Sequence, residues 1–357
     1  MILIMDNISF IVITELTTPA SPPNPVIALG IFIGVVIFTF LVLKLKVIGT
    51  IFKTREQRDR ELIEDILKQL YHVQKSNTSA NVSSLAGALR IGNARLISIV
   101  EHMSEMELIN TDGDRLVLTE TGQDYALKII RIHRIWEKYL SEKTGYNKLD
   151  WHGQAEEKEH KLTAKQTEEI YQELGNPRYD PHGDPIPTEQ GEMLDANWSP
   201  LPSFNANDEV RIVHIEDEPE VVFKQIIGQK LHIGSHLKLT STEGQSIKFY
   251  CEGINYELST IIGSNINAVL LNNNEIFERG KVRLSSLEDA KDAQVLGISS
   301  ECRGAARRRL LDLGFTPGAN IKAEYAGPNK NPRAYRIRNT LIALRNDQAE
   351  LILIEKK

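Results

Sequence analysis

The chain has 357 residues, enough for two or three domains, and its 41% hydrophobic and 25% charged residues are ordinary for a globular protein. A net charge of −6 excludes a chain that is basic throughout, so any surface that binds nucleic acid has to be local. The only two cysteines, Cys251 and Cys302, lie far apart, which excludes a cysteine knuckle for metal and fits a reducing cytoplasm.

A long apolar run lies near the N-terminus. Residues 26–43 carry no charge, and a helix needs roughly 20 apolar residues to cross a bilayer. Basic residues follow this run and none precedes it. The positive-inside rule therefore predicts residues 1–25 outside the inner membrane, a single transmembrane helix at 26–48 and the bulk of the chain in the cytoplasm. A cleaved signal peptide is the alternative, but the basic segment that begins such peptides is missing.

Residues 54–125 have the pattern of a winged helix-turn-helix domain. Apolar residues recur at helical spacing over residues 60–74. A short helix at 82–89, a turn and a second helix at 94–106 precede a hairpin that turns at Asp112–Gly113. In such domains the second helix of the pair enters a DNA groove.

Polar and basic residues around that second helix are the candidate DNA contacts. They are Arg90, Asn93, Arg95, Ser98, His102 and Arg115. Glu101, Glu105 and Glu107 lie in the same stretch, and carboxylates that face phosphate are unfavourable. A winged helix that serves only as a protein-interaction module is therefore the alternative.

Imidazole and carboxylate groups are concentrated between residues 133 and 160. His133 and Glu137 are one helical turn apart, and the spacing recurs in a second group. That group consists of His152, Glu156, Glu159 and His160. Nitrogen and oxygen donors without a thiolate suit Mn²⁺ or Fe²⁺ better than a structural Zn²⁺ site. The alternative is a pair of solvated amphipathic helices stabilised by ion pairs between neighbouring turns.

Together, residues 60–271 resemble the metal-dependent repressor family of the diphtheria toxin repressor and the manganese transport regulator. The resemblance rests on the helix ELIEDILK, on the spaced His and Glu residues, and on the segment DPHGDPIP at Asp180–Pro187. It implies a homodimer with two metal ions per subunit and a helical metal-binding and dimerisation domain at 126–175. The implied ligands are Glu61, Glu64, His133, Glu137, His152, Glu156, Glu159 and His160.

The C-terminal part predicts two small barrels after a linker. Residues 176–207 are rich in Pro, Gly, Asn and Asp, whereas 208–277 and 281–357 contain short alternating strands, as in a duplicated SH3-like barrel. The second copy resembles the ferrous-iron transport accessory protein FeoA through RLLDLGFTPGA and AYRIR. The first resembles the SH3-like domain of the repressors, which can lend ligands to the metal; the acidic segment Glu216–Glu220 is the expected donor.

We therefore expect an α+β multidomain fold with a transmembrane helix, a winged helix-turn-helix, a helical dimerisation domain and two SH3-like small β-barrels. The expected function is a membrane-anchored, Mn²⁺- or Fe²⁺-dependent transcriptional regulator that binds operator DNA of metal-uptake genes. The alternative is an accessory subunit of a ferrous-iron transporter that does not bind DNA. We do not expect an enzyme, because no nucleophile with a base and an orienting group is recognisable.

Overall fold

The structure is a computed structural model. The residues that it describes are Val26, Leu29, Ile33, Gly34, 56–76, 78–195, 197–242, 244–272, 280–327 and 331–357. Residues 1–25 and almost all of the transmembrane helix predicted at 26–48 lie outside this set. Among the described residues, no helix combines the length and the apolar character that a membrane crossing requires.

The chain divides into a unit of residues 1–63 and a unit of residues 64–357. Residues 56–63 of the first unit are helical, and so are residues 64–75 at the start of the second. The helix predicted at 60–74 is therefore present.

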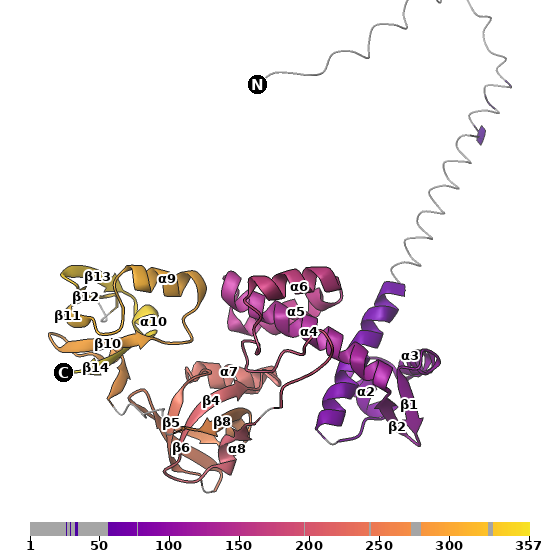
Figure 1. Ribbon diagram of the computed structural model, residues 1–357, viewed down its shortest axis with the longest axis horizontal. Coiled ribbons are helices and arrows are strands. Elements are labelled where there is room, and N and C mark those ends of the chain that lie inside the picture. Colours follow the sequence, from indigo (N-terminus) through magenta and orange to yellow (C-terminus); the bar gives the residue numbers. More distant parts are fainter. Residues whose placement is uncertain are drawn as a thin grey trace, which may run out of the picture. The chain divides into compact units, whose positions relative to one another are not determined.

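The second unit continues with a helical part and a small hairpin (Figure 1). Its elements are α2 (Val82–Leu89), α3 (Asn93–Glu105), β1 (Ile109–Asp112), β2 (Arg115–Leu118), α4 (Glu120–Lys143), η1 (Lys148–Asp150), α5 (Trp151–Glu159) and α6 (Ala164–Glu173). Asn81 and Thr119 begin α2 and α4, because their side chains accept hydrogen bonds from backbone N–H groups of the first turn. The predicted order of two helices and a hairpin is confirmed.

Two six-stranded antiparallel sheets follow. The first contains β3 (Ser199–Pro200), η2 (Leu201–Ser203), β4 (Glu209–Ile215), α7 (Glu220–Gly228), β5 (His236–Ser241), β6 (Ser246–Cys251), β7 (Ile254–Ser259), α8 (Thr260–Gly263) and β8 (Ile266–Leu270). The second contains β9 (Lys281–Arg283), η3 (Leu284–Ser286), β10 (Asp292–Ile298), α9 (Gly304–Asp312), β11 (Asn320–Ala326), β12 (Arg333–Ile337), β13 (Thr340–Leu344), α10 (Asn346–Ala349) and β14 (Ile352–Lys356).

The two sheets have the same topology. Their strand orders are β3-β8-β4-β5-β6-β7 and β9-β14-β10-β11-β12-β13, so each strand of one has a counterpart in the other. A helix follows the third strand in both orders, α7 after β4 and α9 after β10 (Figure 1). The predicted duplication is thus confirmed at the level of strand order. The α+β multidomain class follows from these sheets and the preceding helices.

Each sheet encloses its own apolar core. Phe249 and Leu237 are buried in the first, and Tyr335 and Phe315 in the second. The burial alternates along β4, which is the period-two pattern expected of a strand with one face inward. These cores give a rigid base to the loops between strand and helix.

Candidate metal centre

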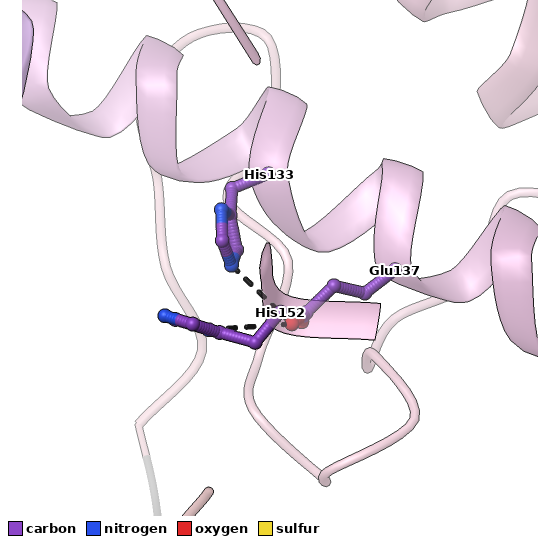
Figure 2. A group of neighbouring side chains, drawn as sticks. All are labelled: His133, Glu137 and His152. Carbon is purple, nitrogen blue, oxygen red and sulfur yellow. Dashed lines mark ion pairs between the residues drawn. The ribbon is translucent and has the colours of Figure 1, made fainter. Parts of the chain in front are cut away.

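His133 and Glu137 lie one turn apart on α4 and point to the same side, where His152 meets them from α5 (Figure 2). The Nε2 atom of His133 is 3.3 Å from the Oε1 atom of Glu137, and the Nδ1 atom of His152 is 3.6 Å from the same oxygen. The two imidazole rings meet edge to face, with centroids 4.9 Å apart. The predicted helix spacing therefore brings these three groups together.

Two further side chains reach Glu137 from outside the helices. The Nε2 atom of His182 is 3.8 Å from Glu137 Oε1, and the Oδ2 atom of Asp217 is 3.0 Å from His152 Nδ1. We call His133, Glu137, His152, His182 and Asp217 the Glu137 cluster. Asp217 belongs to the acidic segment expected to donate a ligand. His182 was not predicted as a ligand; its signal in the sequence is its place within DPHGDPIP.

The loop of His182 is held rigidly beside α4. The Oδ1 atom of Asp180 accepts hydrogen bonds from the backbone N–H groups of His182 and Asp184, at 2.8 and 2.9 Å. Gly183 has a φ of +97°, and a Cβ atom there would lie 2.1 Å from a backbone oxygen, so only glycine fits. Arg134 on α4 donates to the Asp184 carboxylate at 2.9 Å. These contacts fix the direction of the imidazole.

The Glu137 cluster is strongly charged; His133, Glu137 and His182 are buried, whereas His152 and Asp217 are half-buried. Burial opposes ionisation of Glu137, but His133 and His182 hold its pKa well below the usual range. Burial likewise disfavours the imidazolium of His152, but Asp217 and Glu137 raise its pKa. Among the described residues, Glu137 Oε1, His152 Nδ1 and His182 Nε2 are buried without a hydrogen-bond partner. Converging donors of this kind fit a divalent cation, which would accept all three lone pairs.

A second group lies at the end of α5. The Nδ1 atom of His160 is 2.5 Å from Glu64 Oε2, and its Nε2 atom is 3.3 Å from Asp65 Oδ1 and 3.7 Å from Glu159 Oε1. We call Glu64, Asp65, Glu159 and His160 the Glu159 cluster. Burial disfavours the imidazolium of His160, but Asp65 and Glu64 raise its pKa to about 9. The hydroxyl of Tyr125 donates to Glu64 at 2.7 Å.

His133 lies between the two clusters. Its Nδ1 atom is 2.5 Å from Glu159 Oε2, whereas its Nε2 atom faces Glu137. Burial and the charge of Lys68 disfavour the imidazolium, but Glu137 and Glu159 raise the pKa of His133. One imidazole thus contacts a carboxylate of each cluster.

Glu156 and Glu61 were also predicted as ligands. Glu156 lies beside His152, with its Oε1 atom 3.4 Å from His152 Nε2, because these residues share one face of α5. Glu61 lies in the unit that ends at Ile63 and accepts a hydrogen bond from Gln57 at 2.9 Å. Asp65 was not predicted; its signal is its place next to Glu64.

The candidate DNA contacts are distributed over α3 and its surroundings. Asn93, Ser98 and His102 are exposed on α3, whereas Arg95 is partly buried. Arg90 ends α2 with a φ of 53°, and Arg115 is exposed at the start of β2. The exposed Glu101 and Glu105 share α3 with them, and His102 pairs with Glu105 at 3.6 Å. The exposed surface of α3 is therefore of mixed charge.

Known proteins resemble separate parts of this chain. The family described as "iron dependent repressor, metal binding and dimerisation domain" matches residues 119–188, and the FeoA domain family matches residues 282–356. The chain is 40% identical to a probable metal transport system membrane protein of Chlamydia trachomatis over 80 residues. The aligned segment is 22% of this chain and 18% of that protein. Over 153 residues it is 26% identical to the iron-dependent repressor IdeR of Mycobacterium bovis, which covers 43% of this chain and 65% of that protein.

The fold has a counterpart among solved structures. A manganese-dependent transcriptional repressor in complex with manganese superposes with a TM-score of 0.55 at 24% identity, over 58% of this chain and 99% of that chain. The chain spans less than two thirds of the length of the Chlamydia and Mycobacterium relatives. The first family match contains α4, α5 and the DPHGDPIP segment, and thus most of the Glu137 cluster. Residues 119–188 therefore match the metal-binding and dimerisation domain of iron-dependent repressors, residues 282–356 match the FeoA domain, and the chain that carries them resembles the diphtheria toxin repressor and manganese regulator family.

Proposed function

We propose that this chain is a metal-dependent transcriptional regulator that binds operator DNA as a homodimer when Mn²⁺ or Fe²⁺ is bound. The observation that carries the proposal is the Glu137 cluster, whose buried and unpartnered donor atoms converge inside a domain of the iron-dependent repressor type. Its imidazole and carboxylate donors suit either ion, and cellular supply would decide between them.

Each cluster would hold one cation. The Glu137 cluster would bind it through His133, Glu137, His152, His182 and Asp217, with Glu156 near His152 as a further oxygen. The Glu159 cluster would bind it through Asp65, Glu159 and His160, with Glu64 against His160. The cation would supply positive charge to carboxylates that otherwise repel one another.

The Glu159 cluster offers a route from metal to DNA. Glu64 and Asp65 belong to the helical residues 64–75, which precede α2 and α3, whereas Glu159 and His160 stand at the end of α5. A cation shared between them would fix the DNA-reading part of the chain against the dimerisation helices. Metal then shifts the population toward the DNA-binding arrangement, provided that it binds this arrangement more tightly.

The test is DNA binding by the full-length chain to the region upstream of its own gene. Fluorescence anisotropy is measured with Mn²⁺, with Fe²⁺ under anaerobic conditions, and with chelator. We expect a Kd of about 10⁻⁸ M or below with metal, and binding at least about tenfold weaker with chelator. Equal affinity in chelator and metal would contradict the proposal.

Two variants separate metal sensing from DNA contact. His160→Ala removes a ligand, so DNA affinity should no longer depend on metal. Arg95→Ala removes a candidate DNA contact, so DNA affinity should fall by about 1–3 kcal/mol with the response of DNA binding to metal preserved. The reverse pattern would refute the assignment of these two residues.

The second candidate is an accessory subunit of a ferrous-iron transporter. The FeoA domain at residues 282–356 and the acidic residues on α3 favour it. In that case the clusters would report cytoplasmic iron to a transporter. Metal binding without affinity for DNA in the anisotropy experiment would select this candidate.

Membrane anchoring is a separate proposal, and it rests on the uncharged run of residues 26–43. The full-length chain should remain in the membrane fraction after an alkaline wash. A variant with Gly34→Arg and Val36→Arg should move to the supernatant, because each charge in the centre of the run costs about 2.5–3.5 kcal/mol on insertion scales. Recovery of the unmodified chain in the supernatant would contradict anchoring.

A further inference from the structure

A lysine side chain lies within the Glu159 cluster. Lys68 is one turn after Glu64 on the helical residues 64–75, and its Nζ atom is 2.8 Å from Glu159 Oε1 and 3.0 Å from Oε2. The side chain of Lys68 is 16% exposed and that of Glu159 is fully buried. The ammonium group therefore holds both oxygens of a candidate metal ligand in a largely dry environment.

The Lys68 ammonium occupies the oxygens of Glu159 that a divalent cation would need. The cation would need an oxygen of Glu159 together with Asp65 and His160, whose donor atoms lie within 4.8 Å of one another. Lys68 already donates to both oxygens, and His133 contacts one of them. Two cations that share one buried carboxylate repel each other, since charges interact strongly where water is excluded. The ammonium must leave its place, or weaken its contacts, before the metal can bind fully.

The Glu137 cluster is arranged differently. Its central carboxylate faces the imidazoles of His133, His152 and His182 at 3.3 to 3.8 Å. Imidazole nitrogens can bind a divalent cation, so the groups that face Glu137 are themselves candidate ligands. An ammonium with three donors and no lone pair cannot become a ligand in this way while it remains charged.

We propose that Lys68 is a built-in competitor for the cation of the Glu159 cluster, so that this cluster fills at a higher metal concentration than the Glu137 cluster. The inference rests on the proposed function, in which both clusters are metal sites. It adds a residue that sets the concentration at which the second site fills. Lys68 is thus a positioning and threshold residue, and it binds no metal itself.

The test is a calorimetric titration of the full-length chain with Mn²⁺. Lys68→Met keeps the apolar stem and removes the ammonium. Lys161→Met is the matched control. Lys161 is one residue from His160 and pairs with the exposed Glu157 at 2.8 Å, so this substitution removes the same charge without touching Glu159. We expect the weaker Mn²⁺ site to tighten about tenfold in Lys68→Met and to change less than about twofold in Lys161→Met.

A double-mutant cycle with His160→Ala assigns the gain to the Glu159 cluster. The gain from Lys68→Met should vanish in the His160→Ala background, because the site that it improves is then incomplete. Thermal melts of the metal-free proteins show whether each variant folds. Lys68→Gln replaces Lys68→Met if the latter does not fold, since glutamine keeps a donor without the charge.

The outcomes separate this inference from the proposed function. Two Mn²⁺ sites with unchanged affinity in Lys68→Met would overturn the role of Lys68 and leave the metal sensor intact, as would an equal gain in Lys161→Met. Absence of Mn²⁺ binding to the unmodified chain would overturn the metal sensor. In that event, binding that appears in Lys68→Met would support the competitor, and no binding in either protein would overturn it too.

Discussion

The Glu137 cluster and the Glu159 cluster use the same kinds of side chain, and in both a carboxylate is almost completely buried, with 2% of Glu137 and 1% of Glu159 exposed. They differ in what offsets that negative charge. Only imidazoles, those of His133, His152 and His182, surround Glu137, whereas Glu159 is contacted by the lysine ammonium of Lys68 in addition to the imidazoles of His133 and His160.

This difference separates two ways of keeping a metal ligand buried. A buried carboxylate needs a partner in the metal-free protein, because an unpaired buried charge is very costly. Imidazoles meet that need and can then bind the metal, so the Glu137 cluster is prepared for a cation. The Glu159 cluster is stabilised in part by the Lys68 ammonium, which has to move away from Glu159 before a cation can bind. We therefore expect the Glu137 cluster to bind metal first.

The largest effect is expected from Glu137→Gln, which removes the centre of the first cluster. Breaking a buried charge pair costs about 3–5 kcal/mol, so Mn²⁺ affinity at this cluster should fall by roughly two to nearly four orders of magnitude. Calorimetry should then report one weak site in place of two. Two unchanged sites would mean that the Glu137 cluster does not bind metal.

The metal-free protein should also respond to Glu137→Gln. Its three imidazoles lose the carboxylate that they face, so the free energy of unfolding in urea should decrease. Glu157→Gln is the control, because Glu157 is an exposed residue of α5 that pairs with Lys161. It should leave both the unfolding and the metal titration unchanged.

The next effect is a dependence of Mn²⁺ affinity on pH, and it concerns the Glu159 cluster. The pKa of His160 is raised from 6.5 to about 9, so its proton stabilises the metal-free fold fully below pH 6.5 and this contribution is lost as the pH rises through about 9. Metal needs the neutral imidazole. Affinity should therefore rise by up to about tenfold per pH unit within this window.

Competition with a chromogenic chelator at pH 6.5, 7.5 and 8.5 measures this dependence. His160→Ala should flatten the part of the slope that belongs to the Glu159 cluster. An affinity that is constant over the window, or that falls as the pH rises, would show that His160 does not lose a proton to the metal.

The smallest effect is expected from Asp217→Asn, which tests the contribution of the first six-stranded sheet. The amide retains an oxygen that can still bind the cation, so only the charge is lost. Mn²⁺ affinity at the Glu137 cluster should fall about tenfold. Glu218→Gln is the control, because the side chain of Glu218 is 74% exposed although it lies 3.4 Å from His152. Equal losses in both variants would remove the special role of Asp217.

The two six-stranded sheets give a second comparison. In the first, the loop between β4 and α7 brings Asp217 to His152. In the second, the equivalent loop between β10 and α9 holds Glu301 and Arg303, which contact Lys148 at 2.7 Å and Ser141 at 3.4 Å. The same position in a duplicated fold thus contacts the Glu137 cluster in one copy and contacts the helical part through Lys148 and Ser141 in the other.

The sequence by itself determined the features that depend on neighbouring residues. Helix spacing placed His133 with Glu137, and a turn at Gly113 fixed the hairpin of β1 and β2. The alternating apolar and polar residues of the strands also predicted two similar small sheets, because alternation of buried and exposed residues is a local property of a strand.

Only the tertiary structure decided which groups meet across the chain. His182 and Asp217 approach Glu137 from loops that lie 45 and 80 residues further along the sequence, and Lys68 reaches Glu159 across 91 residues. Nothing in the local sequence fixes such distances, since they follow from how helices, linker and sheet pack together. Glu156 illustrates the same limit, because His152 and His160 each stand one helical turn from it in the sequence, and only the structure shows that it lies beside His152.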